Sequence, residues 1–305
     1  MTTALITHPA CLDHELPRHP ERPERLQAIL DHLDNTGLIR DLTQVTAEEA
    51  DNQVLTRIHP VDFIEFIQEL SPVSGSARID PDTYMSPGSL RAARLAVGAC
   101  IQATEMVLSR SVDNAFCAVR PPGHHTELRE AMGFCLFNNI AVAVQTALLD
   151  KQVSRVAIVD FDVHHCNGTV DIFKQREEVL VCSSFQYPFY PNRYLDYQNA
   201  HIITSPLRAG SGSDEFRKEV EEVWLPAIEE HKPDMIFISA GFDAHRDDLM
   251  GELNLDEADY LWVTTTIKNL ANEHANGRIV STLEGGYDLQ ALAASAHAHL
   301  EGLIG

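Results

Sequence analysis

Short apolar runs alternate along the chain with longer segments of mixed hydrophobic and polar residues. Apolar runs of four or five residues occur at 115–119, 156–159, 237–241 and 280–283. Short, uninterrupted, β-branched runs predict buried strands of a parallel sheet. We expect helices to follow Pro23, Pro60, Pro87, Gly133 and Gly212, the last of them over 213–231, and others near 256–275 and 288–302. The alternation predicts an α/β fold with a central, mostly parallel sheet and helices on both faces.

Ionisable side chains follow the run 156–159 immediately. They are Asp160, Asp162, His164 and His165, and the carboxyl end of such a strand is where ligands bind in open α/β sheets. In an extended segment Asp162 and His164 would point to the same side. A carboxylate oxygen and an imidazole nitrogen suit Zn²⁺. The alternative is a cap on the next helix, which would account for one Asp only.

Two further runs end in the same way. The run 237–241 leads into Asp243, and the run 280–283 leads into Tyr287. If the three strands are parallel neighbours, these side chains converge with Asp162 and His164 at one edge of the sheet. Three protein ligands with an open fourth position are typical of a catalytic zinc. Such a metal lowers the pKa of a bound water towards neutrality.

A fourth cluster follows the run 115–119. Two prolines and a glycine fix a rigid loop before His124 and His125. Adjacent imidazoles can serve as a general base and acid because they titrate near working pH. The alternative is a surface pair, since the chain has fifteen His. The following segment, GFCLFNN, is too apolar for a plain surface loop, and we expect Phe134 to line a pocket.

The strings RPPGHH, GFCLFNN, DFDVHHCNGT, SAGFDAH and EGGYDL resemble the zinc-dependent histone deacetylase family. The resemblance is to its class II and bacterial deacetylase-like branch, which is related to acetylpolyamine amidohydrolases. The strings lie in the family's order over 120–289, and HPERPERL at 19–26 and DPDTYMSPGS at 80–89 extend the match. The resemblance implies the arginase/deacetylase fold with about eight strands. It also implies one Zn²⁺ per chain and a structural K⁺.

The resemblance implies a role for each residue that matches a motif. The implied zinc ligands are Asp162, His164 and Asp243. His125 is implied as the general base and then the acid, with Asn167 orienting it. His124 is implied as the second His of the pair, kept charged or oriented by Asp160.

Further residues are implied to bind the substrate and a potassium ion. Tyr287 would hydrogen-bond the substrate carbonyl, Gly133 would accept a hydrogen bond from the substrate amide, and Phe134 would form one wall of an acyl-lysine tunnel. The implied potassium ligands are main-chain oxygens of Asp160, Asp162, His164 and Ser184, with the side chains of Asp160 and Ser183.

Three positions depart from the family pattern. Cys166 stands where relatives usually have Gly, so a backbone conformation that needs Gly is in doubt there. We expect its thiol to be a small buried filler. Phe185 replaces a His that is common after the potassium-binding segment. Met250 falls near the gatekeeper Glu of polyamine-selective relatives, and an apolar side chain there argues against that mode of selection.

Length and composition fit one domain over residues 1–305. No linker, repeat or low-complexity segment divides the chain. The net charge of −22 argues against nucleic-acid binding and against anionic membranes, and would attract a basic substrate. The alternative is an adaptation to salt or solubility. Three of the six Cys residues, Cys117, Cys135 and Cys182, lie within apolar runs, and this together with the lack of a signal peptide predicts a cytoplasmic protein. The sequence does not specify an oligomeric state.

Four functions compete for these motifs. The first is a zinc amidohydrolase that removes acetyl or other acyl groups from lysine side chains or related amines, with acetylated lysine peptides or acetylated amines as substrates. The second is a binuclear manganese ureohydrolase, which needs more carboxylates than the single Asp243 offers after its strand. The third is an inactive binding module, which would usually lack a ligand or the Tyr. The fourth is an acetylpolyamine or small-molecule deacetylase, or an esterase, using the same site.

Overall fold

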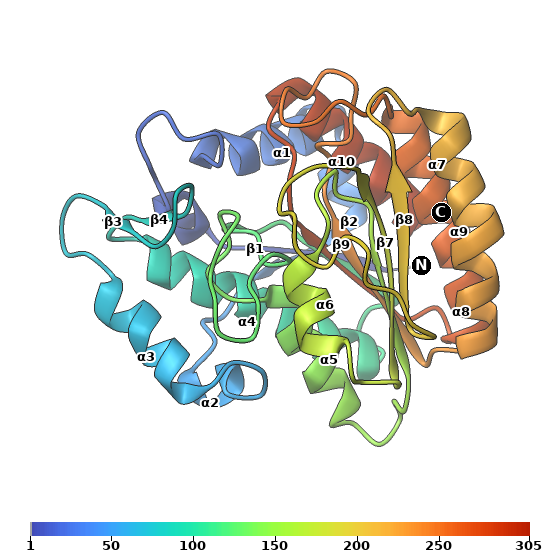
Figure 1. Ribbon diagram of the computed structural model, residues 1–305, viewed down its shortest axis with the longest axis horizontal. Coiled ribbons are helices and arrows are strands. Elements are labelled where there is room, and N and C mark those ends of the chain that lie inside the picture. The colour runs from blue at the N-terminus through green and yellow to red at the C-terminus, as the bar shows by residue number, and fades with distance from the viewer. Residues whose placement is uncertain (1) are drawn as a thin grey trace.

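The computed structural model describes residues 2–305 and is built around one eight-stranded sheet (Figure 1). The strands are β1 (Thr3–Thr7), β2 (Leu42–Thr46), β5 (Asn114–Cys117), β6 (Val156–Asp160), β7 (Val179–Gln186), β8 (Ile202–Leu207), β9 (Met235–Ala240) and β10 (Ile279–Leu283). Their order is β2-β1-β5-β10-β9-β6-β7-β8, and every pairing is parallel. The expected single α/β domain with a parallel sheet is confirmed.

Helices cover both faces of this sheet (Figure 1). One layer contains α4 (Ser89–Leu108), α5 (Asn139–Leu148) and α6 (Asn167–Phe173). The other contains α1 (Pro23–Thr36), α7 (Ser213–Glu219), α8 (Leu225–His231), α9 (Glu257–His274) and α10 (Leu289–Ile304). Outside these layers lie α2 (Asn52–Leu55), α3 (Val61–Leu70) and the hairpin of β3 (Ala77–Arg78) and β4 (Tyr84–Met85). With both faces covered, the central strands are fully buried, which explains their continuous apolar runs.

The segment predicted as one helix at 213–231 is interrupted. A π-helical turn at Val220–Trp224 separates α7 from α8. The break precedes Pro226, the second residue of α8. Because proline has no N–H to donate, it removes a hydrogen bond from the regular helical ladder, and π-helix occurs mostly as a single turn within an α-helix, as it does here.

The strand order places four site-bearing strands side by side. In the middle of the sheet β5, β10, β9 and β6 are consecutive neighbours. Since all of them are parallel, their carboxyl ends meet at one edge, and the loops that follow them are brought together there. The segments rich in ionisable residues that were identified in the sequence are these loops.

Within residues 2–305 none of the helices combines the length and the apolar character that a membrane crossing requires. The expectation of no membrane association remains a prediction.

Candidate active site

The loop after β6 brings the first two predicted metal ligands together. β6 ends at Asp160, and residues 162–164 form a bend rather than continuing the strand. The extended geometry expected for Asp162 and His164 is therefore wrong, although the two side chains do meet. The main-chain N of Asp162 donates to Asp160 Oδ1 at 3.0 Å, and that of His164 donates to Asp162 Oδ1 at 2.9 Å. Carboxylates that accept from the backbone two residues on produce such turns.

Asp243 completes a cluster of three buried ligand atoms. His164 Nδ1 lies 3.0 Å from Asp162 Oδ1 and 3.2 Å from Asp243 Oδ2. The three ligating atoms all lie within 4.8 Å of one another. Asp243 Oδ2 is buried and accepts no hydrogen bond, which is costly unless another group meets it. Two carboxylates and one imidazole at this separation fit a zinc ion, whose ligands are of these types.

Glycine is required beside this cluster. A Cβ at Gly285 would lie 2.1 Å from Asp243 Oδ2 and 2.5 Å from Asp162 Oδ2. The main-chain N of Gly285 also donates to Asp162 Oδ2 at 2.8 Å. The loop after β10 therefore approaches both carboxylates so closely that any side chain at this position would displace them.

The two histidines of the RPPGHH loop have different partners. His124 Nδ1 lies 2.9 Å from Asp160 Oδ2, and His125 Nδ1 lies 2.7 Å from Asn167 Oδ1. Both rings are almost fully buried, and their centres are 4.1 Å apart. The contacts expected from the sequence, Asp160 with His124 and Asn167 with His125, are both present.

These environments separate the pKa values of the two imidazoles. Burial disfavours the charged form of His124, but the charges of Asp160, Asp162 and Glu284 outweigh it and raise the pKa to about 10. Burial lowers the pKa of His125 well below its usual value, and the positive charge of His124 lowers it further. His124 is therefore the charged member at neutral pH, and His125 is the neutral member that is able to accept a proton.

Tyr287 borders the same pocket. The guanidinium of Arg25, from α1, lies over its ring at 4.6 Å and donates to the main-chain oxygen of Glu284 at 2.6 Å. Asp248 accepts from the main-chain N of Tyr287 and from that of Asp288. Burial raises the pKa of Tyr287 well above its usual value. Its hydroxyl is therefore protonated and available as a hydrogen-bond donor.

Glu284 is a buried acid for which the sequence reasoning proposed no role. Its Oε2 accepts from the main-chain N atoms of Gly123 at 2.7 Å and His124 at 3.1 Å. Its Oε1 accepts from Ser239 Oγ at 3.2 Å. Burial raises its pKa to about 7. The carboxylate thus supports the loop that carries both histidines, and the only signal in the sequence was an acid at the end of an apolar strand.

A pocket of about 350 Å³ opens onto these groups. Six predicted residues line it, namely His125, Gly133, Phe134, His164, Met250 and Tyr287. Four more line it that the sequence analysis did not identify, namely Asp82, Phe189, Tyr190 and Leu249. The ring of Phe189 stacks on His164 with centres 5.4 Å apart, and Tyr190 meets His125 edge-on at 5.3 Å. Only the aromatic content of 187–197 hinted at this wall.

Gly133 and Phe134 also line the pocket, and both have an unusual backbone conformation. Both residues have positive φ angles, of 57° and 68°. A Cβ at Gly133 would lie 2.3 Å from Cδ2 of His125, so the glycine allows the loop to touch the imidazole. The left-handed conformation is uncommon for an aromatic residue and is characteristic of functional sites.

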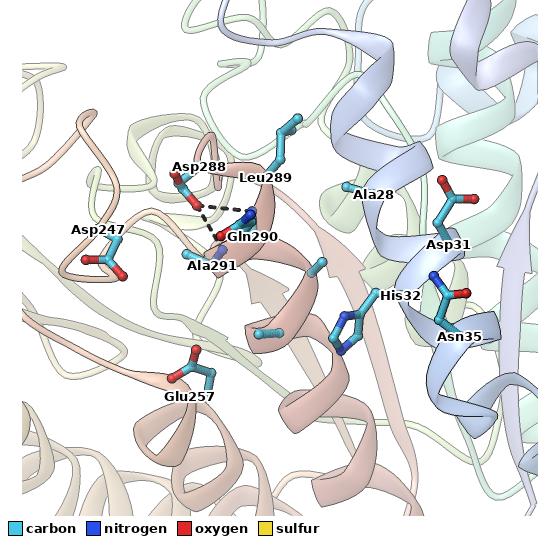
Figure 2. Close-up of a pocket in the computed structure, with 12 residues that line it drawn as sticks. Ala28, Asp31, His32, Asn35, Asp247, Glu257, Asp288, Leu289, Gln290 and Ala291 are labelled. Carbon is cyan, nitrogen blue, oxygen red and sulfur yellow. Dashed lines mark hydrogen bonds between the residues drawn. The ribbon is translucent and has the colours of Figure 1, made fainter.

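A larger hollow of about 710 Å³ lies away from the cluster (Figure 2). Figure 2 shows it between α1 and the beginning of α10, with Asp247 and Glu257 at its edge. Asp31 and Asp288 also line it, whereas none of the predicted site residues does. It is an acidic surface depression, and the smaller pocket contains the candidate chemistry.

Besides Met250, which lines the pocket, two positions depart from the family pattern. Cys166 is buried and has φ −76°, so its backbone does not need Gly, and the thiol is a filler as expected. Phe185 is buried against the ring of His165, with centres 4.3 Å apart.

Of the residues expected to bind potassium, Ser183 pairs with Asp160 in the register of β6 and β7. Ser184 follows it in β7 and is buried as well.

Comparison with known proteins agrees with this geometry. A model of the histone deacetylase domain matches residues 19–303. The chain belongs to the histone deacetylase family. It is 37% identical over 276 residues to a histone deacetylase-like amidohydrolase of Pseudomonas aeruginosa, covering 88% of this chain and 72% of that protein. It is 34% identical to a probable deacetylase of Archaeoglobus fulgidus, covering 95% and 82%.

A solved histone deacetylase structure has the same fold. The crystal structure of the HDA15 HD domain superimposes with a TM-score of 0.94 at 35% identity. The match covers 99% of this chain and 89% of that one. The family, the fold and a hydrolase of the deacetylase class are therefore established for this chain.

Proposed function

We propose that this chain is a zinc-dependent amidohydrolase that removes acetyl or other acyl groups from lysine side chains or related amines. The observation that carries the proposal is the buried cluster of Asp162, His164 and Asp243, whose His164 lines a pocket together with His125 and Tyr287. It is supported by the deacetylase names of the relatives. A second, potassium site on Asp160, Asp162, His164, Ser183 and Ser184 is part of the proposal.

The metal would be held by Asp162, His164 and Asp243. When bound there, Zn²⁺ would supply Lewis-acid polarisation of the scissile carbonyl and a water of lowered pKa. The hydroxyl of Tyr287 donates a hydrogen bond to the carbonyl oxygen, where negative charge develops in the transition state. One such donor contributes roughly 3–4 kcal/mol in comparable sites.

The two histidines divide the proton transfers. His125 is neutral, so it removes the proton from the attacking water and then returns it to the departing amine. His124 keeps its charge beside Asp160 and contributes a fixed positive potential. Asp160 and Asn167 hold the two rings in place.

The aromatic walls position the acyl-lysine. Phe134 and Phe189 offer apolar faces to the methylene groups of a lysine side chain, and the main-chain oxygen of Gly133 accepts from its amide N–H. Met250 lies at the same pocket and carries no charge, so it offers no partner to a second ammonium. The acid that polyamine-selective relatives carry near this position is therefore missing, although Asp82 still places one carboxyl group at the pocket.

A substrate panel on the zinc-loaded protein tests the proposal. Acetyl-lysine peptides, longer acyl-lysines, acetylpolyamines and aryl esters would be compared, each with the His125→Ala variant as a control. We expect acyl-lysine hydrolysis that depends on His125. Hydrolysis of aryl esters alone would identify an esterase, and a preference for acetylpolyamines would identify a polyamine deacetylase. Two tightly bound manganese ions per chain would favour a ureohydrolase.

A further inference from the structure

The side-chain amide of Asn167 lies between His125 and a second buried group, Glu127. Its Oδ1 is 2.7 Å from His125 Nδ1, and its Nδ2 donates to Glu127 Oε1 at 2.8 Å. The two ends of an amide are chemically opposite, because the oxygen only accepts and the nitrogen only donates. The direction of this amide therefore decides whether His125 Nδ1 carries a proton.

The surroundings of Nδ2 permit only one direction. Besides Glu127, this nitrogen faces the main-chain oxygen of His125 at 3.3 Å and Met132 Sδ at 3.4 Å. All three are acceptors, so a reversed amide would place its oxygen against three acceptors. Glu127 makes the shortest of these contacts and is the only one with a charged side chain. It therefore contributes most to the observed direction.

Glu127 is in turn held as an acceptor from its other side. Arg193 Nη1 lies 3.0 Å from Glu127 Oε2, and the side chain of Glu127 is mostly buried. A guanidinium has donors and no acceptor. Arg193 also pairs with Glu130 at 2.7 Å, on the exposed side. Donors and acceptors thus alternate at every contact along the series from Arg193 through Glu127 and Asn167 to His125.

We propose that Glu127 is a positioning residue that sets the tautomer of His125 through Asn167. With Asn167 Oδ1 facing it, the ring proton of a neutral His125 must sit on Nδ1, and Nε2 keeps its lone pair. The inference rests on the proposed function, in which His125 uses that lone pair as the general base. The family resemblance implies an orienting role for Asn167, and Glu127 is the group that orients Asn167 itself.

The test is the variant Glu127→Gln with a designed rescue. Arg193 would hold the oxygen of the amide introduced at position 127, so the NH₂ of that amide would face Asn167 Nδ2. Because two donors would then face each other, the favoured response is reversal of the Asn167 side chain. We expect kcat to fall by roughly tenfold or more, as for other residues that orient an active imidazole, with KM nearly unchanged. Asn167→Asp alone should also be poor, because two carboxylates would then face each other.

The double variant Glu127→Gln, Asn167→Asp should be more active than either single variant. The amide introduced at position 127 would donate to the carboxylate introduced at position 167, and that carboxylate would accept from His125 Nδ1. Glu130→Gln is the matched control, because it removes the charge of the outer partner of Arg193 without touching Asn167, and its kcat should stay at the wild-type value. Wild-type kcat in Glu127→Gln, or a double variant no better than the single ones, would overturn the proposal.

Nitrogen NMR of the histidine-labelled, zinc-loaded protein gives a readout that does not depend on activity. We expect the His125 proton on Nδ1 in the wild type and a mixture of tautomers in Glu127→Gln, with His125→Ala used to assign the signal. A wild-type proton on Nε2 would overturn the inference even if the variants fold poorly. If the wild type shows the Nδ1 tautomer but hydrolyses no acyl-lysine, the proposed function fails while the positioning role stands.

Discussion

The guanidinium of Arg25 covers one face of the Tyr287 ring at 4.6 Å. Arg25 lies on α1 and Tyr287 lies in the loop after β10, at opposite ends of the chain. Arg25 is itself paired with the buried Glu21 at 3.0 Å. A cation over an aromatic face is attracted by the ring's electron density, so the first helix fixes the position of the predicted carbonyl-binding tyrosine.

Replacing Tyr287 with Phe should lower kcat by roughly 10²-fold or more, because one donor to the developing oxyanion is lost. The ring and its contact with Arg25 remain, so zinc content and melting temperature should not change. Steady-state kinetics with an acetyl-lysine peptide measures kcat, metal analysis measures the zinc content, and thermal unfolding measures the melting temperature. Full activity of this variant on an amide would show that Tyr287 only packs against Arg25.

Asp243→Asn should reduce zinc binding strongly, because it removes a charged ligand whose buried Oδ2 accepts no hydrogen bond. Zinc content after dialysis against a weak chelator measures the effect, and added Zn²⁺ or Co²⁺ should restore activity to the chelated wild type. Asp247→Asn is the matched control, since that side chain is 69% exposed. Unchanged zinc content in Asp243→Asn would remove this residue from the ligand set.

His125→Ala should abolish amide hydrolysis, whereas His124→Ala should leave measurable activity. The first loses the proton-transfer group, typically worth about 10²–10⁴-fold, and the second loses only a positive charge held beside Asp160. Initial rates across the neutral pH range compare the two. Equal residual rates would contradict the division of roles drawn from their partners.

Glu284→Gln should make unfolding less dependent on pH. The carboxyl of Glu284 has its pKa raised by burial to about 7 from the usual 4.5. Between these values the folded state binds more protons than the unfolded state, so this group lowers stability as pH rises through the window. The free energy of unfolding of the wild type should therefore fall by up to about 3 kcal/mol relative to that of the variant between pH 4.5 and 7.

Denaturant unfolding of both proteins at several pH values measures this difference. Because Gln keeps an oxygen for the N–H groups of Gly123 and His124, the variant should fold and retain the loop. Glu284→Ala, which keeps no acceptor, should instead be destabilised at every pH. A stability difference between wild type and Glu284→Gln that does not change with pH would contradict the raised pKa.

The sequence predicted the strands of the sheet centre and the residues at their ends, because buried parallel strands have continuous apolar runs. It placed Asp162, His164, Asp243 and Tyr287 at one edge of the sheet, and the structure brings them together there beside His125. The local geometry of Asp162 and His164 was wrong, since backbone bonds to Asp160 and Asp162 bend the chain where an extended strand was assumed.

Residues that act through long-range contacts were not predicted. Glu127 and Glu284 support the histidines through Asn167 and through main-chain N–H groups, and neither contact leaves a local pattern in the sequence. Phe189 and Tyr190 reach the pocket from a segment without regular structure. Periodicity has nothing to detect in such a segment, and its side chains are directed by packing with distant parts of the chain.

The position of β10 between β5 and β9 has a consequence for how the protein is made. During synthesis, the gap in the middle of the sheet stays open until residues 279–283 have left the ribosome. Pairings between such distant segments are slow to form, and unpaired strand edges are prone to aggregate meanwhile. We therefore expect a strong dependence on chaperones in the nascent chain, and a catalytic pocket that becomes complete only in the last step of folding.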